Sequence, residues 1–307
     1  MNAIEKNLLR EVAELDGLPT GAYNLRINGA SAARGTTANV DIVPKEDKPG
    51  INIIIRPGTR GESIHIPVIL SEAGLHDLVY NDFYIGEDSD VTIVAGCGIH
   101  NCGGGSATAQ HDGIHTFHLE KNAHLRYVEK HYGEGDGRGK QVMNPTTIVH
   151  LAEGAHMEME TTQIAGIDDT IRRTSGDLAE GASLTVREKI MTCGTQRAAT
   201  DFSIEMNGEG CSANVVSRSV ARDESRQEFT SRLNGNCACA GHSECDAIIM
   251  DHACVLASPQ LTANSVDAQL IHEAAIGKIA GEQLIKLMTL GLDEKEAEEQ
   301  IISGFLQ

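Results

Sequence analysis

The sequence contains few aromatic and few basic residues. Among 307 residues there is no tryptophan, and there are five tyrosines and five phenylalanines against 32 glycines. A compact α/β core usually contains more rings as fillers, so this composition favours a core of stacked, shallow β layers. Lysine and arginine number 25 against 44 acidic residues, which gives a formal net charge of -19. Nucleic acids and anionic membranes bind clustered basic residues, so we expect neither as a partner.

Long apolar runs and targeting signals are also missing. No stretch approaches the roughly 20 apolar residues of a membrane span, and the first residues, MNAIEKNLLREVAEL, form an amphipathic helical pattern and not a signal peptide. We therefore expect a cytoplasmic protein. In that compartment its eight cysteines are expected to be free thiols or metal ligands. A nucleophile elbow is missing too, so a serine–histidine–aspartate triad is not indicated.

From about residue 75 the sequence repeats a short unit. Each copy has a small acidic or glycine-containing turn, one small residue, and then an alternation of apolar and polar residues. The copies occupy residues 86–94, 120–128, 152–160, 179–187, 208–216 and 265–273. The small residues that mark four copies, Ala123, Ala155, Ala182 and Cys211, recur at uneven intervals of roughly 30 residues, a spacing typical of solenoids.

The runs between these turns have the length of strands, about five to eight residues. A repeat made only of strands predicts a parallel β-helix, because one coil cannot bury its own apolar face and must stack on the next. A β-sandwich or jelly roll is the alternative, although a recurring turn–strand unit is not expected there. We predict an N-terminal helix and small β region in residues 1–74, a β-helix core in 75–270, and a C-terminal helical segment in 271–307.

The C-terminal segment has apolar residues at helical spacing, followed by Gly291 as a stop. Asp293 is the expected N-cap of a second helix, with Glu296 as its capping-box partner. Two short helices of this kind are typical of a docking element or of a cap on the end of a solenoid. The apolar residues are Ile276, Ile279, Leu284, Leu287 and Met288.

Residues 234–273 combine thiols, imidazoles and carboxylates, which indicates a site for a soft or borderline metal, or for sulfur chemistry. This stretch contains Cys237, Cys239, Cys245, Cys254, His242, His252, His272, Glu244, Asp246 and Glu273. Cys254 lies in an apolar run, so we expect it in the core together with Cys193 and Cys211.

Three blocks of this region resemble the SufB/SufD family of the SUF iron–sulfur assembly system. They are GHSECDAIIM (241–250), IHEAAIGKI (271–279) and EQLIKLMTLGLDEKEAEEQIISGF (282–305). The similarity covers roughly residues 75–307, and the short chain looks like a compact SufB-like form. The resemblance implies a mainly β fold, a right-handed parallel β-helix with flanking helices.

The resemblance also implies a function. Members of the family are scaffolds on which a nascent, transient iron–sulfur cluster is built, and they bind a SufC-type ABC ATPase through their C-terminal helices. They associate as homodimers or SufB/SufD-type heterodimers, and sulfur comes from a donor such as a cysteine desulfurase. The protein itself would then not be an enzyme, because the ATPase carries the catalytic activity. A SufD-like subunit that holds the ATPase without binding a cluster is the alternative.

The family's functional residues are carried over position by position. Its cysteine falls on Cys245, and its Glu-His-Glu block falls on Ile271, His272 and Glu273, so the first acid is missing here. The resemblance leaves Cys245, His272 and Glu273 as the metal ligands. Since Cys245 and Glu273 are separated by about one repeat, we expect them side by side on adjacent coils. Mixed thiolate, imidazole and carboxylate ligation would hold a cluster yet release it.

Two further groups of cysteines are candidate sulfur or metal ligands. Cys237 and Cys239 point the same way on a strand, and the alternative is a pair of core thiols. Cys97 and Cys102 precede several histidines in residues 95–120, a pattern that can bind metal but does not fit zinc-finger spacing. The glycines at 103–105 indicate a flexible loop, and no Gly-Lys-Ser/Thr follows them, so nucleotide binding is not indicated.

A carbohydrate-active β-helix enzyme is an interpretation of a different class. That fold often uses acid clusters with aromatic sugar platforms, and the scarcity of aromatic residues argues against it. We expect the acidic pair at 168–169 to be solvated turn residues. The basic residues Arg172, Arg173 and Arg197 are expected to balance the acid excess.

Overall fold

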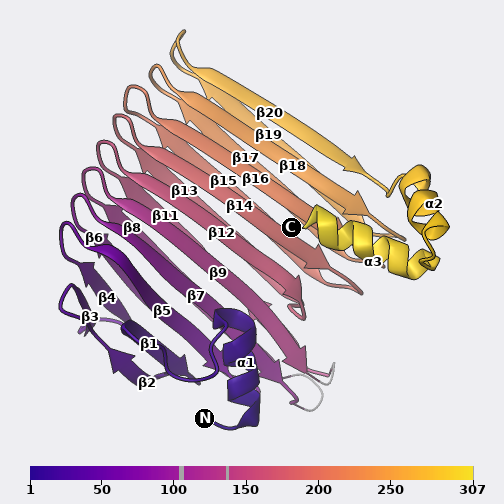
Figure 1. Cartoon of the computed structure of the whole chain (residues 1–307), viewed down its shortest axis with the longest axis horizontal. Helices are drawn as coiled ribbons and strands as arrows, with labels where there is room; N and C mark the ends of the chain where they lie inside the picture. The colour runs from indigo at the N-terminus through magenta and orange to yellow at the C-terminus, as the bar shows by residue number, and fades with distance from the viewer. Residues whose placement is uncertain (104–106, 136–137, 307) are drawn as a thin grey trace.

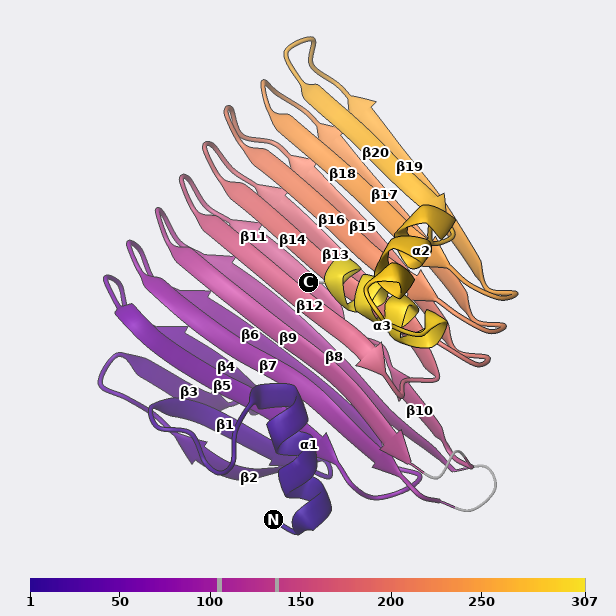
Figure 2. The ribbon, with the colours of Figure 1, turned by 45° about the vertical axis from the view of Figure 1, so that its right-hand side comes forward.

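The computed structural model describes residues 1–103, 107–135 and 138–306. Within these residues the chain forms two facing ten-stranded sheets with three flanking helices. Figures 1 and 2 show the chain climbing from the N-terminal end to the C-terminal end, with most consecutive strands alternating between the two sheets. Adjacent strands pair in parallel, except for two antiparallel pairs near the N-terminus, β1 (Ala22–Ile27) with β2 (Ala30–Gly35) and β3 (Val40–Pro44) with β4 (Gly50–Ile55). The predicted parallel β-helix is confirmed.

The first sheet, in spatial order, consists of β2 (Ala30–Gly35), β1 (Ala22–Ile27), β5 (Arg60–Leu70), β7 (Asp90–Asn101), β9 (His124–Gly135), β12 (His156–Ala165), β14 (Ser183–Thr192), β16 (Ser212–Ala221), β18 (Ala240–Ile249) and β20 (Gln269–Gly277). The second consists of β19 (Cys254–Ala263), β17 (Arg226–Gly235), β15 (Arg197–Met206), β13 (Asp169–Leu178), β10 (Lys140–Met143), β8 (Thr108–Leu119), β6 (His76–Ile85), β4 (Gly50–Ile55) and β3 (Val40–Pro44). β11 (Thr146–Leu151) also pairs with both β8 and β13.

The core lies between the two sheets because side chains alternate strictly along each strand. Every second residue of β8, β13 and β16 is buried, and in-register residues stack between rungs. Phe83 and Phe117, for example, stack with ring centroids 4.3 Å apart. The small marker residues of the repeat, such as Ala123 and Ala155, are fully buried at the turns. The repeat therefore corresponds to the rungs.

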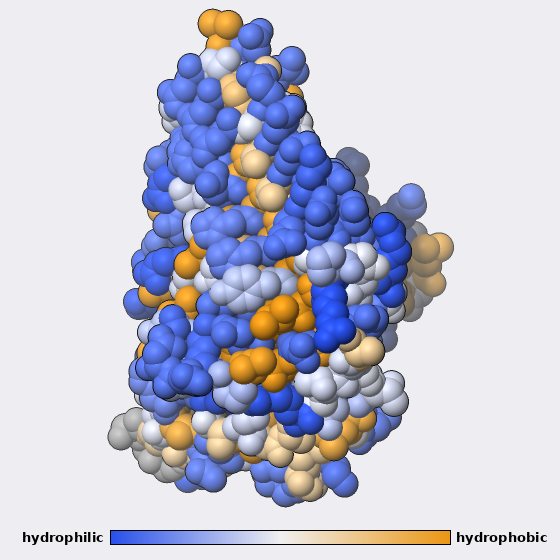
Figure 3. Space-filling model, turned by 90° about the vertical axis from the view of Figure 1, so that its left-hand side faces the viewer, coloured by the Kyte–Doolittle hydropathy of each residue, from blue (hydrophilic) through white to orange (hydrophobic). Residues whose placement is uncertain are grey.

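The tight turns have a left-handed residue at equivalent places on successive rungs. Asp88, Asn122 and Gly154 have φ of 56°, 55° and 67°. Asparagine, aspartate and glycine tolerate this conformation better than other residues, which explains the acidic or glycine-containing turns. A groove of about 620 Å³ lies among these turns, lined partly by His118, His150 and Leu178, and includes no predicted site residue. Figure 3 shows this side of the molecule as mostly hydrophilic, with an interrupted hydrophobic strip.

Helix α1 (Ala3–Ala13) covers the first sheet near its N-terminal end (Figure 1). Its buried residues Leu8 and Val12 pack with Leu25 and Ile69. Gly98 of β7 permits this close approach, since a Cβ there would lie 2.9 Å from the Leu8 Cβ. None of the helices in the described residues has the length and apolar character that a membrane crossing needs.

The C-terminal helices are α2 (Gly281–Thr289) and α3 (Glu294–Phe305). The predicted cap of α3 is confirmed: the Asp293 carboxylate accepts from the Glu296 backbone N–H at 2.8 Å, and Glu296 accepts from the Asp293 N–H at 2.9 Å. Helix α3 packs through Ile302 against Val220 and Ile248, at the carboxyl ends of β16 and β18. This contact anchors the tail to the solenoid.

The expected start of the helical tail at Ile271 is wrong. Residues 269–277 form β20, which pairs in parallel with β18 over its whole length. Pairing with an existing edge strand overrides the helical spacing of Ile276 and its neighbours, because it satisfies the backbone of both strands. The parallel pairing also begins before residue 75, since β4 and β5 already pair with β6 and β7.

Candidate functional site

The last two strands of the first sheet carry the predicted ligands, but in a different register from the one expected. Cys245 on β18 stands opposite Ala274 on β20, whereas Glu273 stands opposite Glu244. The rung is therefore one residue longer than the separation of Cys245 and Glu273 along the chain. A shift of one residue turns a side chain to the other face of a strand. The predicted side-by-side placement of Cys245 and Glu273 is wrong, since they lie on opposite faces.

The inner face combines Cys245 with His272. Cys245 is 1% exposed, and His272 stands opposite the inward residue Ser243. Its Nδ1–H donates to the Ser243 carbonyl oxygen at 3.0 Å, which leaves Nε2 with a free lone pair. From strand spacing and rise, these diagonal positions are about 8 Å apart at the backbone. That separation is within reach of a bridging ligand between a thiolate and an imidazole.

The outer face combines Glu273 with two residues that were not predicted as ligands, His242 and Glu244. One ligand atom from each of the three lies within 4.8 Å of the others. His242 Nδ1 lies 2.9 Å from the Asn214 Oδ1, to which it can only donate, so Nε2 is free to bind, 3.6 Å from Glu273 Oε2. Metal-ligating histidines commonly have such a second partner. The sequence prediction assumed a repeat one residue shorter than this rung. With the longer repeat it would have paired Glu244 with Glu273.

A column of buried polar residues runs down the first sheet below Cys245. One rung apart in register stand Glu129, Thr161, Glu188, Ser217 and Cys245. Ser217 donates to the Glu188 carboxylate at 2.9 Å, and Thr200 from the opposite sheet donates to it at 3.1 Å. The interior is therefore not a purely apolar core, and its polar column ends at the predicted cysteine.

Arg172, on β13 of the opposite sheet, faces this column with its positive charge. This residue, expected to balance the acid excess, is 3% exposed and faces its acids inside the solenoid. Its guanidinium donates to Glu129 at 2.6 Å and lies 3.5 Å from Glu188. Burial by itself would raise the pKa of Glu129, but His131 and Arg172 hold it well below its usual range. Burial raises the pKa of Glu188, so the two acids differ in how easily they ionise.

The thiol of Cys245 is protonated near neutral pH. Burial, followed by the neighbouring carboxylates of Glu188 and Asp246, raises its pKa to about 12. A metal ion binds the thiolate and must displace this proton. Only one rung stands between Cys245 and the end of the solenoid, and its residue opposite Cys245 is the small, exposed Ala274. Cys245 is therefore shielded by little more than the last strand.

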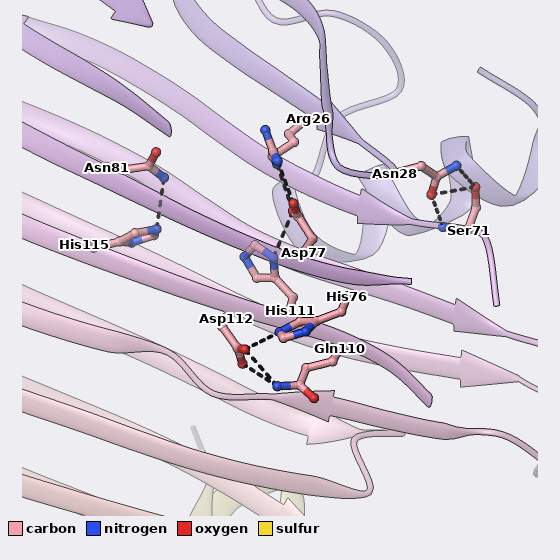
Figure 4. Close-up of polar contacts among 10 residues, drawn as sticks. All are labelled: Arg26, Asn28, Ser71, His76, Asp77, Asn81, Gln110, His111, Asp112 and His115. Carbon is pink, nitrogen blue, oxygen red and sulfur yellow. Dashed lines mark hydrogen bonds and ion pairs between the residues drawn. The ribbon is translucent and has the colours of Figure 1, made fainter. Parts of the chain in front are cut away.

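Further polar groups line the interior toward the N-terminal end (Figure 4). Arg26 makes two hydrogen bonds to Asp77, at 2.6 and 2.8 Å, and His111 approaches the same carboxylate at 3.3 Å. His115 lies 3.2 Å from the Asn81 amide and 2.9 Å from the hydroxyl of Tyr127. That hydroxyl donates to Glu129 at 2.9 Å, which links this group to the column.

The structure places Cys237 and Cys239 in the core, next to a third thiol. Both are less than one-tenth exposed and belong to the main apolar cluster, together with Cys211. Burial, with the neighbouring Cys237 and Cys239, raises the pKa of Cys211 to about 12. Cys193 and Cys254, expected in the core, are exposed.

Cys97 and Cys102 do not lie together. Cys97, on β7, faces the interior of the solenoid, and burial raises its pKa. Cys102 is exposed just beyond the end of that strand. Within the described part of the chain, the group of side chains arranged for a metal includes neither of them. Of the predicted flexible loop at 103–105, positions 104 and 105 lie outside the described residues.

The predicted docking residues of the tail fall into three classes. Ile276 belongs to β20 and is 40% exposed, while Ile279 packs against the apolar cluster that contains Ile302 of α3. Leu284 and Leu287 are half-buried on α2. Met288 is exposed, and so are the neighbouring Ile285 and Leu290, which were not predicted. Helix α2 thus presents an apolar surface that the described chain leaves uncovered.

Comparison with known proteins supports the resemblance. The family model described as SUF system FeS cluster assembly, SufBD core domain, matches residues 79–305. A protein of Methanocaldococcus jannaschii named as an iron–sulfur cluster assembly SufBD family protein is 26% identical over 265 residues, 85% of this chain and 82% of the relative. A Pyrococcus horikoshii protein of that name is 25% identical over 98% of this chain and 94% of its own length. The chain matches 62% of a third relative, from Methanothermobacter thermautotrophicus, at 26% identity.

Proposed function

Because this chain belongs to the SufBD family of the SUF iron–sulfur cluster assembly system, we propose that it is the scaffold on which a nascent cluster is built. The cluster is the cargo of this site and is held only transiently. The protein performs no catalytic step of its own in this proposal, and a SufC-type ABC ATPase supplies the energy.

One observation carries the proposal. Sulfur, nitrogen and oxygen donors from both faces converge on the last two rungs of one sheet, next to the open end of the solenoid. A soft thiolate with a borderline imidazole donor suits sulfide-bound iron, and carboxylates with one histidine suit a free ferrous ion. We assign Cys245 and His272 to the cluster and Glu273, His242 and Glu244 to incoming iron.

The environment of Cys245 suits a site that must both assemble an iron–sulfur cluster and release it. Since burial and nearby carboxylates disfavour its thiolate, the empty site keeps a neutral thiol. Iron and sulfide offset the free-energy cost of forming the thiolate only while they are bound. The hydrogen bond from His272 to the Ser243 carbonyl holds the imidazole with Nε2 free. A weak, mixed ligand set of this kind favours transfer of the finished cluster over permanent storage.

We place the ATPase on helix α2. Ile285 and Met288 are 63% and 43% exposed, and an uncovered apolar surface of this kind is typical of protein contacts. Helix α3 beneath it is anchored through Ile302. Replacing Ile285 by Asp should release a co-expressed SufC-type ATPase without changing thermal stability. Retained co-purification would contradict this docking surface.

The open end of the solenoid is the surface for a second subunit. In the described residues β19 and β20 each pair on one side only, and such edges need cover. A second copy of this chain, or a SufB/SufD-type partner, would provide it next to the ligands. We expect a cysteine desulfurase as the sulfur donor. The eight free thiols are consistent with a cytoplasmic location.

The deciding experiment is anaerobic reconstitution with ferrous iron and sulfide. The Cys245→Ala variant should lose most of its bound iron and acid-labile sulfide, while Cys254→Ala, a change at an exposed cysteine of the opposite sheet, should keep both. Unchanged iron and sulfide in Cys245→Ala would refute the site.

A SufD-like subunit that only holds the ATPase is the second candidate, favoured by the isoleucine at position 271 in place of an acid. Its signature is ATPase binding with no iron or sulfide in the wild type, alone or in the complex. Iron titration of both forms distinguishes the two functions.

A further inference from the structure

Cys102, His100 and Glu134 form a relay of side chains that the proposed function does not use. The Cys102 sulfur lies 3.1 Å from His100 Nε2, and His100 Nδ1 lies 3.1 Å from the Glu134 carboxylate. His100 and Glu134 are register partners on β7 and β9. This site is at the N-terminal half of the solenoid, several rungs from Cys245.

The carboxylate fixes the protonation of the ring. Glu134 can only accept, so His100 Nδ1 carries the proton and Nε2 presents its lone pair to the thiol. The second oxygen of Glu134 accepts from the Asn7 amide of α1 at 3.2 Å, which holds the carboxylate in place. The order of groups is therefore nucleophile, base and orienting acid, the arrangement that activates cysteine and serine nucleophiles.

A metal site explains these residues less well. Because Nδ1 of His100 is occupied by Glu134, only the Cys102 sulfur and one ring nitrogen face a common point, and two donors are too few for a stable zinc or iron site. Cys102 is exposed, so an electrophile reaches it without entering a cavity. This exposed position suits a reaction with a substrate that contains a leaving group.

We propose that Cys102 is a nucleophilic thiol that exchanges with disulfides, as a modification site separate from Cys245. His100 takes the proton of Cys102, and the thiolate attacks one sulfur of the disulfide. The S–S bond breaks, a new S–S bond joins Cys102 to that sulfur, and the other sulfur leaves with the electron pair. The protonated His100 gives its proton to this leaving thiolate. The disulfide is the oxidant, so no other reactant is needed.

The chain offers internal controls for a test of this proposal. Two other thiols are exposed, Cys193 and Cys254, and neither has a histidine within hydrogen-bond distance among the contacts of the described residues. A matched control for His100 is His124, an exposed histidine that also contacts a carboxylate between β9 and β7, at 3.2 Å from Asp90. It lies at the other end of the same two strands.

The experiment measures the rate at which the full-length protein reacts with 5,5′-dithiobis(2-nitrobenzoate) at neutral pH, with the modified cysteine identified by peptide mass spectrometry. Cys102 should react about tenfold or more faster than Cys193 and Cys254. His100→Gln should remove most of this advantage, and Glu134→Gln part of it. His124→Gln should leave it unchanged.

Equal rates at the three exposed cysteines would overturn the proposal, and so would an unchanged Cys102 rate in His100→Gln. Thermal unfolding of each variant shows whether the fold is intact. Because Glu134→Gln preserves the size of the side chain and one acceptor oxygen, it provides a measurement even where His100→Gln disturbs the strand end. The outcome does not depend on cluster assembly, since Cys245→Ala should leave the reaction of Cys102 unchanged.

Discussion

Removal of the buried guanidinium of Arg172 is expected to destabilise the solenoid strongly. In the native chain this group lies between the carboxylates of Glu129 and Glu188 and also donates to His131 Nδ1 at 3.0 Å. In Arg172→Ala both acids remain inside the solenoid without their cation. Breaking a buried ion pair by deleting one partner costs about 3–5 kcal/mol, because an uncompensated charge is left behind.

The neighbouring residue provides the matched control. Arg173 follows directly in sequence but is exposed on the other face of β13. Arg173→Ala should change stability by no more than about 0.5 kcal/mol, as is usual for surface substitutions. The two variants remove the same side chain one position apart. A difference between them therefore reports the interior charge network and not a loss of strand propensity.

The size of the effect can be followed by thermal unfolding. For domains of 150–250 residues, 1 kcal/mol shifts the midpoint by about 2–4 °C, so Arg172→Ala should lower it by on the order of 10 °C. Adding Glu129→Gln to this variant should restore part of the loss of stability, since one of the two acids left without a cation is removed. A midpoint for Arg172→Ala within about 2 °C of that for Arg173→Ala would refute the reasoning.

The same network predicts how stability depends on pH. The pKa of Glu129 is well below its usual range in the folded chain, so its contribution is complete above the unfolded value of about 4.3 and is lost as pH falls through the folded value. In Arg172→Ala the folded pKa rises, and the loss on acidification should begin at higher pH. Unfolding midpoints measured between neutral and acidic pH test this.

Three further predictions concern the backbone, the tail and the outer face. Gly166→Ala should destabilise the chain by about 2–5 kcal/mol, because φ is +69° and the new Cβ would lie 1.8 Å from the Gly133 carbonyl oxygen. The control Gly194→Ala, at φ +59° with open space around it, should cost only about 1–2 kcal/mol. Thermal unfolding of both variants measures the difference. Asp293→Ala removes the capping box of α3 and should cost about 1 kcal/mol locally, seen as faster amide exchange in α3 with unchanged exchange in α1. Glu244→Gln should weaken cobalt(II) binding to the metal-free protein about tenfold, with no change for Glu228→Gln on β17, and equal affinities would count against the outer-face site.

The outcome at the C-terminal end of the chain shows where a local pattern is sufficient. The cap of α3 was predictable because Asp293 and Glu296 bind each other's backbone within one turn. The strand β20 was predicted only in part, by the repeat copy at 265–273. Its continuation to residue 277 was not predicted, because the apolar residues there fit a helical spacing and their extended form depends on pairing with β18, a partner that sequence alone does not bring close. His242 and Glu244 were named in the candidate metal-binding stretch but not chosen as ligands for a related reason, since their link to Glu273 crosses one full rung.

The fold class, the positions of the turns and the family motifs follow from the sequence, because alternation, turn residues and short motifs are properties of neighbouring positions. Which donors share a face depends on the folded arrangement of the rungs. The repeat markers are unevenly spaced along the chain, so no fixed period sets the register of the last rung. A difference of one residue there separates Cys245 from Glu273 and joins Glu273 to Glu244. Only the stacked rungs, through hydrogen bonds between their backbones, select between these two arrangements.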